Sequence, residues 1–215
     1  MADWNIISAL ATAGGTLVLA GASFASIRSA DRAARSAERA VLASLRPLLI
    51  NSRLESPRQK LIWQDGHWRY LTGSAGYLRL ADGHLYLAAS IRNVGPGLGV
   101  IHGWRVAPLE TYQEEAHPDP ATFRRQSRDL YIAPGDTGFW HAALRDPADP
   151  VHQDLVEPVK NGQRVNIDLL YGDAEGGQRT ITRFSLIRGR SKETEEEAWV
   201  CQALRHWNVD RPDPR

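Results

Sequence analysis

The chain opens with a long uncharged segment. Residues 6–27 contain no Asp, Glu, Lys or Arg. A helix over this segment would be about 33 Å long at about 1.5 Å of rise per residue, enough to cross the hydrocarbon core of a bilayer. The sequence therefore predicts a transmembrane anchor over residues 1–27. The alternative is a buried, Ala-rich helix of a soluble protein, although such helices rarely run this long without a charge.

The predicted span is rich in small residues, because most of it is Ala, Gly, Ser or Thr. Small residues gain little from lipid contact, but they allow two helix backbones to approach closely. We therefore expect the span to associate with another span, as a homo-oligomer. The alternative is that Ala and Gly are simply common in this chain. The residues expected to form the contact are Ala11, Gly14, Gly15, Gly21, Ala25, Ala30, Ala34, Ala37 and Val41.

Basic residues follow the span at once. Between Arg28 and Arg46 the sequence has five arginines against Asp31 and Glu38. Basic flanks of a span stay in the cytoplasm, so we expect a single-pass protein of the inner (plasma) membrane with its main domain in the cytoplasm. A cleaved signal peptide fits poorly, because no Lys or Arg precedes the apolar segment. The arginines expected to contact lipid head groups are Arg28, Arg32, Arg35 and Arg39.

Residues 28–46 continue the helical pattern as a juxtamembrane helix. Small and apolar side chains recur every three or four residues on one face, while the arginines lie largely off it. Pro47 then stops the helix. A narrow Ala-rich stripe suits a close-packed helix pair, or a helix that lies along the membrane surface.

After Pro47 the hydrophobic period changes to that of strands. Asp65-Gly66 and Asp82-Gly83 each separate two short apolar runs, which predicts two hairpins. About nine short strands fill residues 47–188, with no helix of useful length between them. This pattern is typical of an antiparallel β-sandwich. The expected fold class is therefore mainly β: a transmembrane helix continued as an amphipathic helix, then the sandwich, then a short C-terminal helix.

That last helix is predicted within residues 189–215, ahead of a tail. Glutamates crowd its first turns and Arg205 and His206 lie near its end, in agreement with the helix dipole. A helix this short must rest either on the sandwich of its own chain or on a partner protein or neighbouring subunit. The residues expected to contact a partner are Trp199, Val200, Leu204 and Trp207.

Four short motifs carry a family resemblance. They are Arg46-Pro47 at the end of a helix and the turn sequences at residues 91–97, 133–136 and 170–173. Over about residues 5–188 they resemble landmarks of uncharacterised bacterial single-pass membrane proteins, which have an N-terminal span and an immunoglobulin-like β-sandwich. The motifs are turn chemistry, so the resemblance implies a fold and no activity.

Searches for catalytic motifs find none. The sequence has no Gly-x-Ser-x-Gly, no phosphate-binding Gly-x-x-x-x-Gly-Lys, no His-Glu-x-x-His and no Cys-x-x-Cys. Its single cysteine, Cys201, is expected to be structural. Acidic residues and histidine alternate near His117, but their spacing fits no standard metal site. The net charge of +1 gives no field that would attract nucleic acid. We therefore expect no enzyme activity, no cofactor and no bound metal.

Two functions remain open. The first is a self-associating interaction or scaffolding module that is tethered to the membrane. The second is a ligand sensor, or an accessory subunit of a membrane enzyme, that binds through the sandwich loops. The second predicts a pocket among residues 110–129, residues 146–161 and four tryptophans, although these tryptophans are explained more simply by packing within the sheet. They are Trp63, Trp68, Trp104 and Trp140.

Overall fold

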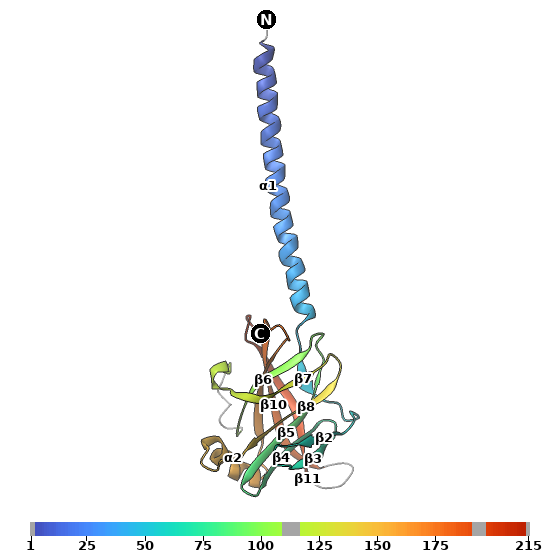
Figure 1. The fold of residues 1–215 in the computed structure, drawn as a ribbon, viewed down its shortest axis with the longest axis vertical. Coiled ribbons are helices and arrows are strands. Elements are labelled where there is room, and N and C mark those ends of the chain that lie inside the picture. Colours follow the sequence, from blue (N-terminus) through green and yellow to red (C-terminus); the bar gives the residue numbers. More distant parts are fainter. Residues whose placement is uncertain (1–2, 109–116, 191–196, 214–215) are drawn as a thin grey trace. The chain divides into compact units, whose positions relative to one another are not determined.

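The computed structural model describes residues 3–108, 117–190 and 197–213 (Figure 1). It divides into two units, Met1–Ser44 and Leu45–Arg215. The first unit consists of one helix, α1 (Trp4–Ser44). The second contains the remaining elements, which are β1 (Leu49–Asn51), β2 (Gln59–Ile62), β3 (Trp68–Leu71), β4 (Ala75–Ala81), β5 (His84–Asn93), β6 (Gly99–Pro108), η2 (Pro120–Thr122), β7 (Arg124–Ile132), β8 (Thr137–Leu144), α2 (Pro150–Lys160), β9 (Val165–Gly172), β10 (Arg179–Arg190) and β11 (Glu197–Asn208).

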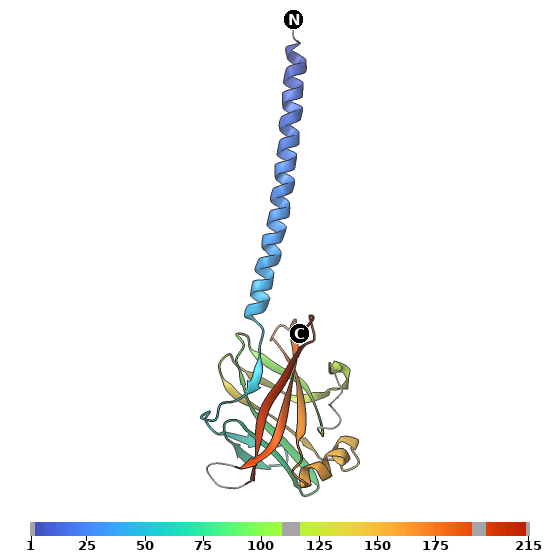
Figure 2. The ribbon, with the colours of Figure 1, turned by 180° about the vertical axis from the view of Figure 1, so that it is seen from behind.

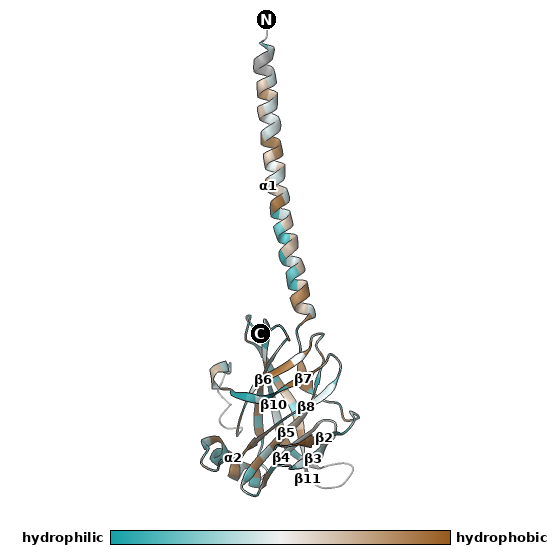
Figure 3. Cartoon of the chain, in the orientation of Figure 1, coloured by the Kyte–Doolittle hydropathy of each residue, from teal (hydrophilic) through white to brown (hydrophobic). Residues whose placement is uncertain are grey.

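α1 is one continuous helix through both of the helical segments expected from the sequence. Over Ser8–Ser44 it is long and apolar enough to cross a membrane, by length and composition, and none of its apolar window is buried in protein. Figure 3 shows pale turns with brown, hydrophobic bands through the N-terminal part of the helix, followed by teal, hydrophilic turns. The helix ends before Pro47, as expected.

Nine strands form one antiparallel sheet in the order β1-β5-β4-β11-β10-β9-β6-β7, and β8 pairs with β5. Strands from opposite parts of the sheet face a common core, because Trp104 of β6 packs on Trp140 of β8 with ring centroids 5.5 Å apart. The sheet is therefore folded over on itself in a sandwich-like arrangement. The predicted mainly β, antiparallel fold is confirmed. Gly66 and Gly83 have φ values of 81° and 78°, as the two predicted hairpin turns require.

The hairpin of β2 and β3 covers the outer surface of part of the sheet. Leu61 and Trp63 are buried there against Tyr86 of β5. This second apolar cluster is separate from the main core, so the hairpin adds a third layer over β4, β5 and β8.

α2 corrects the expectation that no helix separates the strands. The Asp149 carboxylate accepts a hydrogen bond from the Val151 N–H at 2.9 Å, and Pro150 occupies the first turn. This is a standard helix start, in which the side chain and the proline replace missing backbone partners. Leu155 and Val159 then face the main core from one side of the helix.

The predicted C-terminal helix is wrong, because the described part of residues 189–215 forms strand β11, which pairs with β10 (Figure 2). A β-bulge explains the misleading pattern. Leu204 has no partner on β10, so Cys201 faces the main core while Trp207 packs on the opposite surface of the sheet. One extra residue converts strand alternation into the three- and four-residue spacing of a helix. The predicted first turns, residues 192–196, lie outside the described residues.

A buried asparagine organises the turn between β5 and β6. The Asn93 side chain accepts hydrogen bonds from the backbone N–H groups of Leu48 (3.1 Å) and Gly95 (2.9 Å). Its amide donates to the carbonyl oxygens of Gly97 (2.6 Å) and Ile132 (3.0 Å). All four hydrogen-bonding positions of the side chain are therefore used, and the turn is fixed to both β1 and β7.

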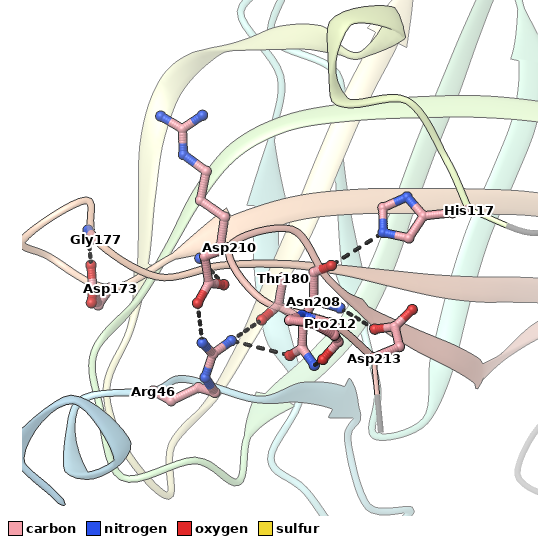
Figure 4. A network of polar contacts seen from close by, with 10 residues as sticks. Arg46, His117, Asp173, Gly177, Thr180, Asn208, Asp210, Pro212 and Asp213 are labelled. Atoms are coloured by element: carbon pink, nitrogen blue, oxygen red, sulfur yellow. Dashed lines mark hydrogen bonds and ion pairs between the residues drawn. The ribbon is translucent and has the colours of Figure 1, made fainter. Parts of the chain in front are cut away.

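The segment that enters the second unit is fixed from two sides. On one side, a Cβ at Gly97 would lie 1.7 Å from the Leu45 carbonyl oxygen, so only glycine permits this close approach. On the other side, the Arg46 guanidinium donates to Asn208 Oδ1 at 3.2 Å and pairs with the Asp210 carboxylate (Figure 4). The segment that leads into β1 is therefore bonded to residues at the end of β11 and just after it.

Candidate binding groove

A groove of about 560 Å³ lies between β7, β8 and the end of β2. This volume falls in the range of about 300–1,000 Å³ that is usual for ligand sites. Aromatic, apolar and basic side chains line it together. The lining residues are Ile62, Trp63, Gln64, Trp104, Arg125, Gln126, Ser127, Arg128, His141, Ala142, Ala143 and Arg145.

An irregularity in β7 builds one wall of the groove. The pairing of β6 with β7 passes from Ile101 opposite Leu130 to Gly103 opposite Arg125. One residue of β6 therefore faces residues 126–129 of β7. Extra residues bend a strand and redirect its side chains, and such bulges often occur next to functional sites. The polar sequence at this bulge explains how Arg125, Gln126, Ser127 and Arg128 come to line the groove.

The charged groups of the lining are all arginines. Arg125 and Arg128 are exposed and form no ion pair with any other described residue. Arg145 differs from them, because its Nε donates to Asp65 Oδ2 at 3.0 Å. Arg125 and Arg128 therefore leave the groove with positive charge that no described carboxylate neutralises.

Asp65 keeps Arg145 in place as an ionised carboxylate. Burial by itself raises the pKa of Asp65, but hydrogen bonds from Tyr86, the His67 backbone and Arg145 lower it below its usual value. The Tyr86 hydroxyl donates to Asp65 Oδ2 at 2.8 Å, which places the carboxylate next to the aromatic cluster under the hairpin. The Arg145–Asp65 pair therefore persists at neutral pH.

Two polar atoms at the groove are buried without a hydrogen-bond partner in the described structure. They are Nδ1 of His141 and Oε1 of Gln126. Burial, followed by the charges of Arg128 and Arg145, lowers the pKa of His141, so its ring is neutral at physiological pH. Most buried polar atoms in proteins are paired. An unpaired buried acceptor beside Arg125 and Arg128 can accept a hydrogen bond from a bound ligand.

The tryptophans expected to form a pocket are divided between different places. Trp63 and Trp104 line the groove, and the Trp63 indole N–H donates to the Ala142 carbonyl oxygen at 2.9 Å. Trp140 is fully buried behind Trp104. Trp68 lies on β3, half exposed. Of the two expected loops, the first supplies the β7 wall through residues 125–128, and its residues 110–116 lie outside the described residues. Residues 146–161 contain α2 and do not line the groove.

The residues expected to contact another helix or the lipid all lie on α1. Each is exposed within the chain, and a Cβ at Gly14, Gly15 or Gly21 would meet no other atom within 4 Å. The four arginines that follow the span and are expected to contact lipid are exposed as well. The structure therefore leaves both predicted surfaces free for contacts outside the chain.

The residues expected to contact a partner near the C-terminus do not share one face. Trp207 is 1 % exposed and covers an outer surface of the sheet, whereas Trp199 packs on the main core. Val200 pairs with Ala75 of β4. Leu204, which occupies the bulge, is the most exposed of this set and is about half exposed.

A buried ion cluster on the outer face of β9 was not foreseen from the sequence. Asp168 is fully buried between two arginines on the neighbouring strands. Arg183 of β10 donates to both of its carboxylate oxygens, at 2.8 and 2.9 Å, and Arg105 of β6 donates to Oδ2 at 2.9 and 3.0 Å. Arg183 also lies over the Trp207 ring at 4.9 Å. These contacts hold three strands together, and the cluster is structural.

The described residues offer neither a reactive cysteine nor a cluster of metal ligands. Burial raises the pKa of the Cys201 thiol to about 12, so the thiolate that a nucleophile needs does not form at neutral pH. Within the described ranges, no three His, Cys, Asp or Glu side chains are grouped so that they could hold a metal ion.

Comparisons with models of protein families, with curated proteins and with solved structures find no match to this chain.

Proposed function

We propose that the chain is a membrane-anchored, non-enzymatic interaction module that holds a protein partner at the membrane. The observation that carries the proposal is α1, whose apolar window is long enough to span a bilayer and finds no protein core. Leu17, for example, is 74 % exposed within the chain. Contiguous apolar surface of this kind requires lipid or another protein to cover it.

The side chains of the groove favour binding over catalysis. Its charges are guanidinium groups, which do not exchange protons at neutral pH and therefore serve poorly as acids or bases. They do attract and orient anionic groups, especially carboxylates, in two-pronged contacts. The neutral His141 lies against the Trp63 ring, with centroids 5.4 Å apart, so it acts here as part of an aromatic wall.

We also propose an orientation of the chain in the membrane and a type of sandwich for its β domain. The five arginines between residues 28 and 46 support an inner-membrane protein whose β domain lies in the cytoplasm. The turn motifs support an immunoglobulin-like sandwich of the kind that occurs in bacterial single-pass proteins. A domain in the cytoplasm would meet a cytoplasmic protein, or the cytoplasmic part of another membrane protein.

Purification of the whole chain from membranes tests the proposed function. We expect the tagged protein to stay in the membrane pellet after alkaline carbonate extraction. Solubilised in mild detergent, it should carry a stoichiometric protein partner, and purification through that partner should recover the chain in turn. Release by carbonate would contradict the anchor, and a chain that purifies alone from native membranes would contradict the module.

We also propose that α1 self-associates, and Gly14 and Gly21 test this. Close helix approach is the one advantage of an Ala- and Gly-rich span over a Leu-rich one, since lipid contact rewards Leu better. Substituting both glycines with Ile should separate the helices while making membrane insertion easier. The mass of the protein in detergent should fall from an oligomer to a monomer in Gly14→Ile/Gly21→Ile.

The variant Thr16→Ile/Ser23→Ile serves as the control, because it adds bulk to two exposed positions on the opposite face of the same helix and should keep the wild-type mass. Equal masses for wild-type and doubly substituted protein, whether monomeric or oligomeric, would show that these glycines do not form the contact.

A second candidate function is ligand sensing, or an accessory role in a membrane enzyme. The volume of the groove, about 560 Å³, favours it, because a small anionic molecule would fit there. Mass spectrometry of the protein purified from membranes distinguishes the two. A small anion retained in place of a protein partner would support the second function.

A further inference from the structure

Both walls of the groove are edges of the sheet. Among the described strands, β7 pairs with β6 alone and β8 pairs with β5 alone. The turn at residues 133–136 joins β7 to β8, but these strands form no ladder with each other. Strand edges present unpaired N–H and C=O groups, which can template an added strand.

The lining residues show that the backbone of β8 faces the groove. Neighbouring side chains of a strand point to opposite faces, so a groove on one face would be lined by alternate residues. Instead, His141, Ala142 and Ala143 line it consecutively. This is expected where the edge of the strand, rather than one of its faces, forms the wall.

The register gives the same result. Asn93 bonds through its backbone to the turn before β8, so alternate residues from Asn93 back along β5 direct their backbone groups at β8. On β8, Trp140 and Ala142 therefore face β5, while Phe139 and His141 direct their backbone groups away from it.

The polar atoms of the groove favour a ligand that has both anionic groups and hydrogen-bond donors. Arg125 and Arg128 attract anionic groups. The Gln126 Oε1 atom, which is buried and unpartnered, accepts hydrogen bonds and so requires a donor. A free carboxylate lacks such a donor. An acidic peptide has both, because its side chains bear carboxylates and its backbone carries an N–H at each residue.

We propose that the groove binds an extended acidic segment of the partner protein, which adds to the free edge of β8 and places its carboxylates on Arg125 and Arg128. This inference rests on the proposed function, since it names the part of the partner that is recognised. Backbone bonds to a strand edge supply affinity, and side-chain contacts supply specificity. Trp63, Trp104 and Ile62 offer apolar contacts for the intervening side chains.

Peptide selection on the full chain tests the inference. A phage library of random dodecapeptides is selected against the protein in detergent micelles, and the strongest binder is synthesised. We expect selected sequences to be enriched in Asp and Glu and depleted in Pro. The affinity of the synthetic peptide should fall about 10- to 100-fold for Arg125→Gln/Arg128→Gln, since two charge-assisted contacts are lost.

The control variant Arg53→Gln/Arg211→Gln removes the same charge from two exposed arginines away from the groove, and it should bind the peptide as the wild type does. Two further peptides carry methyl groups on the odd-numbered or on the even-numbered backbone nitrogens. Only the peptide whose methylated nitrogens would face β8 should bind more weakly. Selection of no peptide, or of peptides without acidic enrichment, overturns the inference. So does equal binding to the groove variant and the control.

The failure of this inference can be told apart from failure of the proposed function. A partner that co-purifies from membranes equally with wild-type protein and with Arg125→Gln/Arg128→Gln leaves the module intact and refutes the groove as its docking site. A chain that binds the selected peptide but purifies alone from membranes refutes the module.

Discussion

Asp168→Asn is expected to lower the free energy of unfolding by about 3–5 kcal/mol, the range seen when one member of a buried ion pair is removed. The substitution keeps the shape of the side chain but removes its charge. Arg105 and Arg183 then face each other's charge without a carboxylate between them, at a position that is fully buried. Denaturant unfolding of the full chain in detergent, followed by tryptophan fluorescence, measures the loss.

Asp154→Asn is the matched control. Asp154 is exposed on α2, so the same change of charge should alter stability by less than about 0.5 kcal/mol. If Asp168→Asn and Asp154→Asn unfold at the same denaturant concentration, the cluster of Asp168 with its two arginines does not stabilise the sheet.

Asn93→Ala should cost about 3 kcal/mol or more. The substitution removes the side-chain partner of four main-chain groups, and Asn93 itself has no exposed surface; each buried group left unpaired costs about 1–3 kcal/mol. These groups belong to the segment after α1, to the turn and to the end of β7. We therefore expect early opening where the chain enters the sheet, detectable as faster amide hydrogen exchange at Leu48 and Gly95.

Asn161→Ala provides the comparison, because Asn161 is exposed at the end of α2 and its side chain makes no hydrogen bond to another described residue. Hydrogen exchange at Leu48 should be unchanged in Asn161→Ala. Exchange that is equally slow in Asn93→Ala would mean that the turn is held by its backbone alone.

The parts of the fold that follow from local chemistry could be predicted from the sequence. An uncharged segment and the proline after it define α1, and Asp-Gly pairs define two hairpins whose glycines have positive φ. Such signals lie within a few neighbouring residues. They do not depend on which strand becomes the neighbour of which.

Features that depend on distant pairing could not be predicted in this way. The bulge at Leu204 exists because β11 pairs with β10, and it disguises a strand as a helix. The ion cluster of Asp168 likewise needs the register of β6, β9 and β10, which brings together residues far apart in the chain. α2 is different, because Asp149-Pro150 is a local start signal that the sequence does contain.

The candidate groove could be predicted only in part from the sequence. The arginines at positions 125 and 128 are visible in the sequence, and the segment that contains them was expected to hold a binding site. Their arrangement around the groove depends on the bulge of β7 opposite β6. The other wall depends on β8 having a single neighbour in the sheet, which no local pattern reveals.

Photo-crosslinking from the groove in native membranes tests the central claim, a membrane-anchored module that holds a partner, most directly. Ser127 lines the groove and is exposed, so it is replaced by a photoreactive amino acid, and Glu175, in an exposed turn, is replaced in the same way as a control. The account predicts a discrete adduct with a second polypeptide, in the membrane fraction, from position 127 and none from position 175. Recovery of the chain in the soluble fraction, or no adduct from position 127, would contradict it.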